Sequence, residues 1–194
     1  MIYQSFFANS YRLYNKSKFR LEDYAYIEET RSLDLKVGLT SYKDLQGTNL
    51  TGVSDTLVDY TQKDGLRFKK LSQAIGVGGW VITRDKKFFL IKNALWKGEQ
   101  GGKLDRPGGH PEPEEAYKDN QLTESSELSG IQVRAEIFSS EQKEIRDEIN
   151  IPLDKQSKPE LIGIVFNLDM GGRIGLEFKI DVNLTSDEVL QLYR

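Results

Sequence analysis

The stretch 139-SSEQKEIRDEINI-151 decides the expected fold and site of this chain. Glu144, Asp147 and Glu148 stand at positions i, i+3 and i+4, so a helix places their carboxylates on one face. The two isoleucines at 145 and 149 form an adjacent apolar stripe that can anchor the helix to a core. Like charges at this spacing repel by roughly 0.2–0.5 kcal/mol per pair. Two interpretations are open: a solvated acidic helix face, or a site for a hard divalent cation such as Mg²⁺, which prefers oxygen ligands.

The same stretch carries signals for both ends of this helix. Ser139 and Gln142 have the spacing of a capping box, so we expect the helix to begin at Ser139 or Ser140. Pro152 disfavours helical backbone at the residue before it and predicts the end of the helix. Glu141 extends the acidic stripe one turn toward the N-terminus.

A second stretch upstream, 104-LDRPGGHPEPEE-115, combines glycine, proline and acidic residues. Within it, Gly109 is followed six positions later by Glu115. Further along stands the run 143-KEIRDEINI-151. Together these residues resemble the Nudix box: a glycine, a glutamate six positions on, and then Arg-Glu-apolar-x-Glu-Glu-x-Gly-apolar.

The departures from the box are specific. Lys143 stands at the box arginine, Asp147 at the first glutamate of the pair and Asn150 at the glycine. A long insertion, taken as residues 116–135, separates the two parts of the box. Lysine is a point charge and cannot reproduce the bidentate fork of an arginine.

Four spaced blocks resemble, in order, the Nudix UDP-glucose diphosphatases of animals, which also carry a long insertion inside the box. The blocks are 38-GLTSYKDLQGTN-49, 104-LDRPGGHPEP-113, 136-EIFSSEQKEIRDEINIPL-153 and 177-EFKIDVNLTSDEV-189. The similarity runs from about Lys18 to the C-terminus. It implies a chain shortened at both ends, which lacks the last strand and long helix of the family.

The resemblance implies a Mg²⁺-dependent hydrolase, with Mn²⁺ as a substitute, that converts UDP-glucose or UDP-galactose to UMP and the sugar 1-phosphate. Such a reaction needs clustered carboxylates around a metal ion and no protein nucleophile. By resemblance, Glu144 and Glu148 are the metal ligands and Asp147 is a supporting or second-ion ligand. Glu115 fills the first glutamate position of the box or is a surface residue of an acidic loop. Glu177 lies on a strand that faces the metal or is a structural glutamate at the core edge.

The matched blocks also suggest substrate contacts. His110 is the only histidine and is expected to contact a phosphate or the nucleotide. Asp105 and Glu112 can accept hydrogen bonds from ribose hydroxyls or the uracil N–H, and Glu112 can instead hold metal-bound water. Tyr42 can stack on uracil or simply pack in the core, and Phe19 is a further candidate for the wall of the same pocket.

Composition limits the other functions. The chain has 194 residues, 38% hydrophobic and 29% charged, which suits one domain with a sizeable core. A net charge of −3 gives no reason to expect nucleic acid or an anionic membrane as partner. The absence of cysteine excludes disulfides, zinc–thiolate sites and thiol nucleophiles. No stretch approaches a membrane span or a secretory signal, so a cytoplasmic location is the default, and the oligomeric state is not indicated.

The order of the expected elements predicts an α/β (α+β) fold, an αβα sandwich with a mixed sheet, as the Nudix resemblance also implies. We expect one domain over 1–194, with an N-terminal substrate-side segment at about 18–75 and the core at 76–194. The expected strands are 19–29, 33–39, a hairpin of 76–83 with 88–92, 161–168 and 174–184. The expected loops are 41–49 and 116–130, the second with a helical turn. The expected helices are 139–151, short ones within 55–70, and one after Thr185 or Ser186. Trp80 is expected to fill the core.

Two other functions stay open. One keeps the chemistry but acts on another nucleoside diphosphate derivative, such as an ADP-sugar or a dinucleotide. The other is a Nudix-like module that binds a nucleotide sugar without cleaving it. Release of UMP from a panel of nucleotide sugars separates all three.

Overall fold

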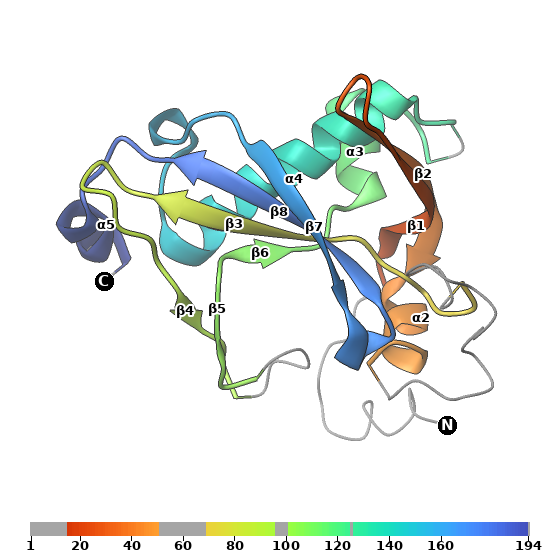
Figure 1. The fold of residues 1–194 in the computed structure, drawn as a ribbon, viewed down its shortest axis with the longest axis horizontal. Coiled ribbons are helices and arrows are strands. Elements are labelled where there is room, and N and C mark those ends of the chain that lie inside the picture. Colours follow the sequence, from red (N-terminus) through yellow and green to blue (C-terminus); the bar gives the residue numbers. More distant parts are fainter. Residues whose placement is uncertain (1–14, 51–68, 96–100, 125, 194) are drawn as a thin grey trace. The chain divides into compact units, whose positions relative to one another are not determined.

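The computed structural model describes residues 15–50, 69–95, 101–124 and 126–193 (Figure 1). These residues form two compact units. The first consists of the described part of Met1–Ile75 together with Phe166–Ile174, and the second of Gly76–Val165 with the C-terminal segment from Gly175. The helices predicted within 55–70 fall almost wholly outside the described residues. The single domain expected over the whole chain stays a prediction.

The first unit is built on an antiparallel pair of long strands, β1 (Ser17–Ile27) and β2 (Ser32–Ser41), which confirms both strands predicted there. The pairing runs from Ser17 opposite Ser41 to Ile27 opposite Ser32, with a bulge after Leu21. The loop expected at 41–49 was wrong in part, because α2 (Tyr42–Gly47) follows directly. The Ser41 hydroxyl accepts a hydrogen bond from the Asp44 N–H and so caps this short helix.

The core of the first unit joins segments far apart in the sequence. The fully buried Asn49 side chain accepts from the Gln73 N–H at 3.1 Å and donates to the Met170 carbonyl at 2.7 Å. The ring of Tyr24 lies 5.6 Å from that of Phe166, centroid to centroid. These contacts tie residues 166–174 to the hairpin. The apolar residues buried in this unit include Phe19, Leu21, Leu45, Leu71, Ala74 and Ile75.

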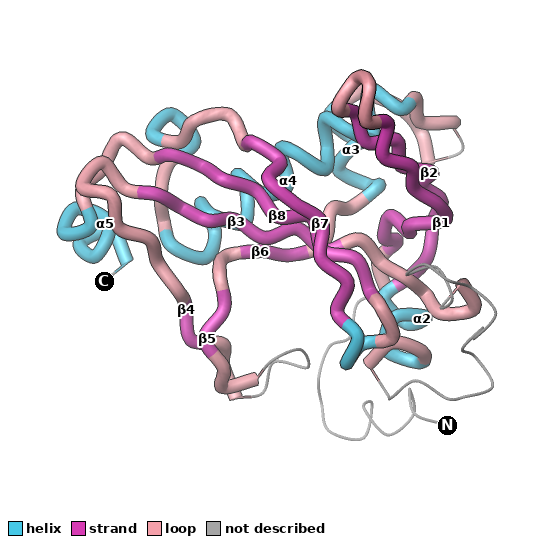
Figure 2. Tube along the Cα trace, viewed as in Figure 1, coloured by secondary structure: helices cyan, strands magenta, loops and turns pink. Residues whose placement is uncertain are grey.

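The second unit contains a mixed sheet in the order β6-β3-β8-β7, as Figure 2 shows by its strand colouring. β3 (Gly76–Ile82) pairs in parallel with β8 (Arg173–Asp181) and antiparallel with β6 (Gly108–Gly109). β7 (Glu160–Asn167) lies beside β8, and the turn between them carries η3 (Leu168–Met170) followed by Gly171 and Gly172. The mixed sheet and the last two predicted strands are therefore confirmed.

The hairpin predicted for 76–83 and 88–92 forms only at its tip. One antiparallel bridge joins Ile82 to Phe88, around a turn closed by the Thr83 N–H donating to the Lys87 carbonyl. Beyond it, β4 (Ile91–Lys92) pairs with β5 (Leu104–Asp105) instead of β3. The prediction was wrong about the second strand's partner, because β3 is already paired on both edges, by β6 and β8.

Three helices belong to the second unit: α3 (Pro113–Asp119), α4 (Gly130–Ile149) and α5 (Ser186–Tyr193), with η2 (Leu153–Lys155) after α4. Residues 116–119 of the predicted insertion loop belong to α3, where a helical turn was expected, and Gly130 already begins α4. Ala116 and Tyr117 are buried on α3, which packs against α4, so this part of the insertion contributes to the core. A proline at the first turn of α3 favours helix there.

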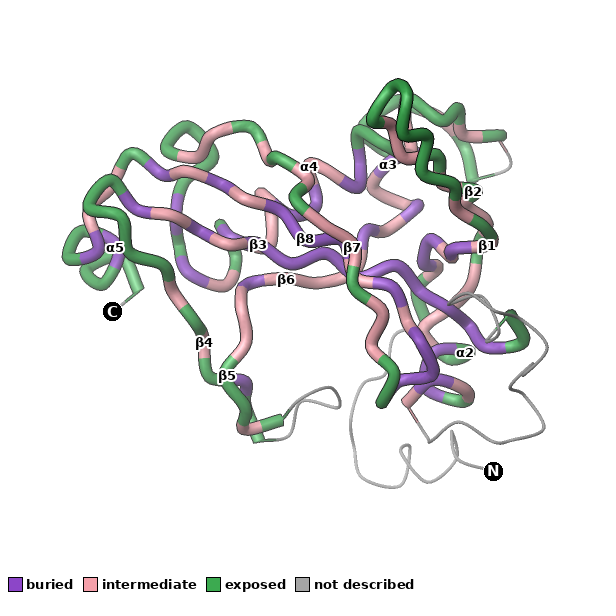
Figure 3. The backbone as a smooth tube through the Cα atoms, in the orientation of Figure 1, coloured by how far each residue is buried: buried purple, intermediate pink, exposed green. Residues whose placement is uncertain are grey.

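Helix α4 is anchored by the apolar stripe predicted from the sequence. Ile145 and Ile149 are 0% and 3% exposed, and Phe138 packs edge-on against Phe178 of β8 with ring centroids 4.9 Å apart. Figure 3 shows β3 and β8 as the most buried strands of the sheet. Among the described helices, none combines the length and apolarity needed to cross a membrane.

Candidate metal-binding site

Helix α4 begins nine residues before the predicted start. The capping box is made by Ser129 and Gln132: the Gln132 N–H donates to the Ser129 hydroxyl, and the Ser129 N–H donates to the Gln132 carboxamide at 2.9 Å. The box predicted at Ser139 was therefore wrong. Ser139 lies inside the helix and donates its hydroxyl to the Glu136 carbonyl one turn earlier.

The carboxylates of α4 meet the glycines of β3 and β6. The Gly108 N–H donates to Glu148 Oε2 at 3.0 Å. The Glu144 carboxylate occupies the position that a Cβ on Gly109 would take, and the Glu141 carboxylate occupies the position of a Cβ on Gly79. Side chains at 79 and 109 would displace these two carboxylates, so the glycines make room for the acidic face of the helix.

Glu141 is the most deeply enclosed of these acids. It is 0% exposed, and neither carboxylate oxygen has a hydrogen-bond partner within the described part of the chain. Burial raises the pKa of the Glu141 carboxyl well above its ordinary value, and the nearby charge of Glu144 raises it further, while Arg106 acts in the opposite direction. Sequence reasoning noticed Glu141 only as an extension of the acidic stripe.

Asp147 lies away from this group. Its side chain is 60% exposed and accepts two hydrogen bonds from Arg146, from Nε at 2.7 Å and from the second guanidinium nitrogen at 3.0 Å. Hydrogen bonding to Arg146 lowers the pKa of Asp147 below its ordinary value. Its predicted role as a supporting ligand stays a prediction and would require release from Arg146.

Lys143 joins α4 to α3. Its Nζ lies 3.1 Å from a Glu136 oxygen, 3.4 Å from Asp119 and 3.8 Å from Glu115. Burial disfavours the charged amine, but Glu136 and Asp119 outweigh this effect and raise the pKa of Lys143. Glu115 is therefore placed beside a cation in a helix–helix contact, which gives it a structural partner. Its catalytic role stays a prediction.

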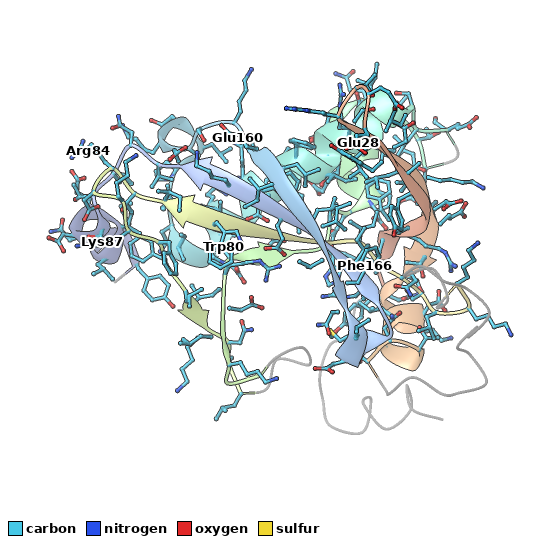
Figure 4. All side chains as sticks on the ribbon, in the orientation of Figure 1. Glu28, Trp80, Arg84, Lys87, Glu160 and Phe166 are labelled. Atoms are coloured by element: carbon cyan, nitrogen blue, oxygen red, sulfur yellow. The ribbon has the colours of Figure 1, made fainter. Side chains whose placement is uncertain are left out.

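A second charged group is formed by Arg106 and its partners. The guanidinium donates to Glu177 and, at 2.8 Å, to Asp105, and it fills the space left by Gly78. Trp80, labelled in Figure 4, projects from β3 and donates its indole N–H to Glu177 at 3.1 Å. The structural interpretation of Glu177 thus has an observed partner, and sequence reasoning missed Arg106.

These residues border a pocket of about 570 Å³ inside the second unit. Trp80 is only partly buried and lines this pocket, so the prediction that it simply fills the core was wrong. Asp105, a predicted substrate contact, also lines it. The remaining lining residues are Leu90, Leu104, Arg106, Ile162, Gly163, Val165 and Glu177.

The other predicted substrate contacts are placed as follows. His110 follows β6 directly and is partly buried, and Glu112 is the N-cap residue of α3. Tyr42 opens α2 in the first unit, where its hydroxyl accepts from Gln46 at 2.6 Å. Phe19 is 1% exposed in the core of the same unit, so its side chain is not available as a pocket wall in this structure.

The arrangement fits a divalent cation in part. Within the described ranges, no three His, Asp or Glu side chains stand close enough together to hold an ion as they are. Two features nevertheless fit one: the buried Glu141 oxygens without partners, and the glycines that let Glu141 and Glu144 approach the strands. Carboxylate oxygens are the ligands that Mg²⁺ prefers.

Comparison with known proteins identifies relatives of this chain. No protein-family model matches the sequence. The "Uridine diphosphate glucose pyrophosphatase NUDT22" of Mus musculus is 35% identical over 184 residues, 93% of this chain and 59% of the mouse protein. The "Nudix hydrolase 9" of Arabidopsis thaliana is 30% identical over 191 residues, 93% of this chain and 61% of the plant protein. The chain thus spans about three fifths of the length of these relatives.

The chain is similar to Nudix hydrolases over 93% of its own length. Among solved structures, the MutT protein of Methanosarcina mazei Go1 is 19% identical with a TM-score of 0.37, over 57% of this chain and 63% of that chain, which is too distant to inform the fold.

The structure explains how the chain accommodates two of its departures from the Nudix box. Asn150, at the box glycine, has φ 59° at the C-cap of α4, in the left-handed region that glycine and then asparagine adopt most readily. Lys143, at the box arginine, still pairs with carboxylates of the same helix and of α3. Both substitutions therefore keep the helix in place.

Proposed function

We propose that this chain is a Nudix hydrolase that cleaves UDP-sugars with the help of a divalent cation. It uses water to convert UDP-glucose or UDP-galactose to UMP and the sugar 1-phosphate. Two observations support the proposal: the carboxylates of Glu144 and Glu148 lie against Gly108 and Gly109, which brings both parts of the box together, and the mouse relative bears the name of a UDP-glucose pyrophosphatase.

Glu144 and Glu148 are the residues proposed to hold the cation, which is Mg²⁺ or Mn²⁺. When bound, a divalent cation neutralises charge on the diphosphate and lowers the pKa of a coordinated water. The Gly108 N–H donates to one oxygen of Glu148 and so fixes its carboxylate beside the glycine pair. Glu144 fills the space over Gly109, where it is close to the backbone of the glycine pair.

The proposed substrate contacts are His110 and Asp105, both from the stretch 104–115, and Tyr42. His110, two residues after Gly108, can donate to a phosphate oxygen. Asp105 can accept from a ribose hydroxyl if it exchanges one of its bonds to Arg106. Tyr42 remains the candidate for stacking on uracil.

The test is incubation of the purified chain with UDP-glucose, UDP-galactose, ADP-glucose and a dinucleotide, each with Mg²⁺, followed by chromatography for nucleoside monophosphate. We expect UMP from the UDP-sugars. Glu148→Gln should lower turnover by at least ~10²-fold, because it removes metal-centred stabilisation worth several kcal/mol.

The matched control is Asp154→Asn, which removes a carboxylate that is 74% exposed on η2. Its turnover should equal that of the parent chain. Binding of UDP-glucose with no release of UMP under any metal would refute a hydrolase and favour a binding module. A preference for ADP-glucose would keep the chemistry and overturn the substrate class.

A further inference from the structure

Glu141 is a buried acid for which the protein supplies no counter-charge by hydrogen bonding. Both of its oxygens lack a hydrogen-bond partner among the described residues, although the side chain is 0% exposed. An isolated buried carboxylate is costly, so such groups are normally paired, protonated or bound to a metal. Glu141 therefore requires an explanation that the Nudix box does not give, since position 141 precedes the second part of the box.

The cationic side chains around α4 are already bonded elsewhere. Arg106 donates to Glu177 and Asp105, Lys143 donates to Glu136 and Asp119, and Arg146 donates to Asp147. Glu141 interacts electrostatically with one cation, Arg106, and with three acids of its own charge sign, Glu144, Glu148 and Glu177. Acids outnumber cations around Glu141, and a cation from solution would offset this excess of negative charge.

The position of Glu141 along the helix supports this interpretation. Glu141, Glu144 and Glu148 stand at i, i+3 and i+7, which places them one above the other on neighbouring turns. Their carboxylates meet a short run of strand backbone, because Gly79 accommodates Glu141, Gly109 accommodates Glu144, and the Gly108 N–H binds Glu148. Because glycine has no side chain, these acids can approach the strand backbone directly.

We propose that Glu141 is a ligand of the divalent cation, the third carboxylate beside Glu144 and Glu148. The inference rests on the proposed function for the identity of the ion, a hard cation such as Mg²⁺ or Mn²⁺ with oxygen ligands. Glutamate has three rotatable side-chain bonds, so binding can draw the carboxylates together while α4 stays anchored by Ile145 and Ile149.

The experiment measures cation binding without any nucleotide. Mn²⁺ affinity is determined by calorimetry and by the spin-resonance signal of the free ion, and Mg²⁺ by the rise in melting temperature that a ligand of the folded state produces. Glu141→Gln keeps the shape of the side chain and removes its charge. We expect its Mn²⁺ affinity to fall at least about tenfold, as for groups that hold or orient a bound metal, with no loss of melting temperature in the absence of metal.

The matched control is Glu136→Gln, on the same helix and also buried, at 4% exposed. Glu136 is bonded to Lys143, so this variant should melt at a lower temperature yet keep its Mn²⁺ affinity. The pair of variants therefore separates loss of a metal ligand from loss of a buried acid.

Parental Mn²⁺ affinity in Glu141→Gln, together with a loss of affinity in Glu148→Gln, would overturn the inference and make Glu141 a protonated core residue. Absence of binding by the parent chain would overturn it as well. A parent chain that binds Mn²⁺ through Glu141 but releases no UMP would leave the inference standing and refute the proposed hydrolase.

Discussion

Gly108 and Gly109 are neighbours on β6, yet a methyl group should have a different effect at each position. A Cβ at 108 would meet the Val77 carbonyl oxygen and lie 3.0 Å from the Gly78 Cα, and both groups are strand backbone that cannot move aside. A Cβ at 109 would meet the Glu144 carboxylate, the far end of a flexible side chain. The first change should therefore damage the fold and the second the site.

The magnitude for Gly108→Ala follows from overpacking. Such clashes cost about 1–3 kcal/mol, and the smaller entropy of the unfolded alanine chain offsets about 0.4–1 kcal/mol. For a domain of this size, 1 kcal/mol shifts the melting temperature by about 2–4 °C. The net loss is at most about 2.6 kcal/mol, so we expect a drop of up to roughly 10 °C in calorimetry without metal. Gly109→Ala should melt close to the parent but lose at least about tenfold in Mn²⁺ affinity, because Glu144 is displaced.

The control is Gly163→Ala on β7, where a Cβ would meet nothing within 4 Å. It should leave cation binding unchanged and raise the melting temperature by about 1–4 °C, because only the smaller entropy of the unfolded alanine chain acts there. The reasoning would be refuted if Gly109→Ala bound Mn²⁺ like the parent, or if both neighbours lowered the melting temperature equally. The first result would remove Glu144 from the site, and the second would show that β6 tolerates no side chain at all.

Two further predictions follow from the charged contacts of the helices. Lys143→Met leaves the buried Glu136 without its cation and should destabilise by about 1–3 kcal/mol in denaturant melts, whereas Lys143→Arg should retain most of the stability; equal melts for the two variants would contradict a role for the charge. Bonding to the Thr185 N–H, and then to its hydroxyl, lowers the pKa of Glu188 from its ordinary 4.5, so this carboxylate stabilises the start of α5 above that pH and the effect is lost as pH falls through the folded pKa. The melting temperature of the parent should exceed that of Glu188→Gln at pH 6, and the gap should close toward pH 3; a gap that does not change with pH would rule out this cap.

The sequence predicted the elements that local pattern controls. The alternating pattern of strands located β1 and β2, and it also located β7 and most of β8. The spacing of Ile145 and Ile149 predicted an anchored helix, and both side chains are buried. These signals are local, because they depend only on the side-chain periods of a strand or a helix.

Local sequence signals did not determine the residue at which α4 begins. Ser129 with Gln132 and Ser139 with Gln142 offer the same capping-box spacing, and the sequence does not choose between them. The choice is made by packing: Phe138 lies against Phe178 on β8, so the helix must already be formed before Ser139. The burial of Ala116 and Tyr117 on α3 was also not evident from the sequence, because both residues lie in a polar stretch.

Tertiary structure also decided which acids of α4 face the strands, although helical spacing already indicated part of the answer. With 3.6 residues per turn, Glu141 and Glu148 lie about 40° and 60° from the direction of Ile145, whereas Asp147 lies about 160° away. Burial of Ile145 therefore turns Glu141 toward the strands and Asp147 toward solvent, where it binds Arg146. Helical spacing gathers the acids on one side of α4, but only the docking of that helix on Gly79 and Gly109 determines which carboxylates are enclosed, because enclosure depends on the surface that the helix meets.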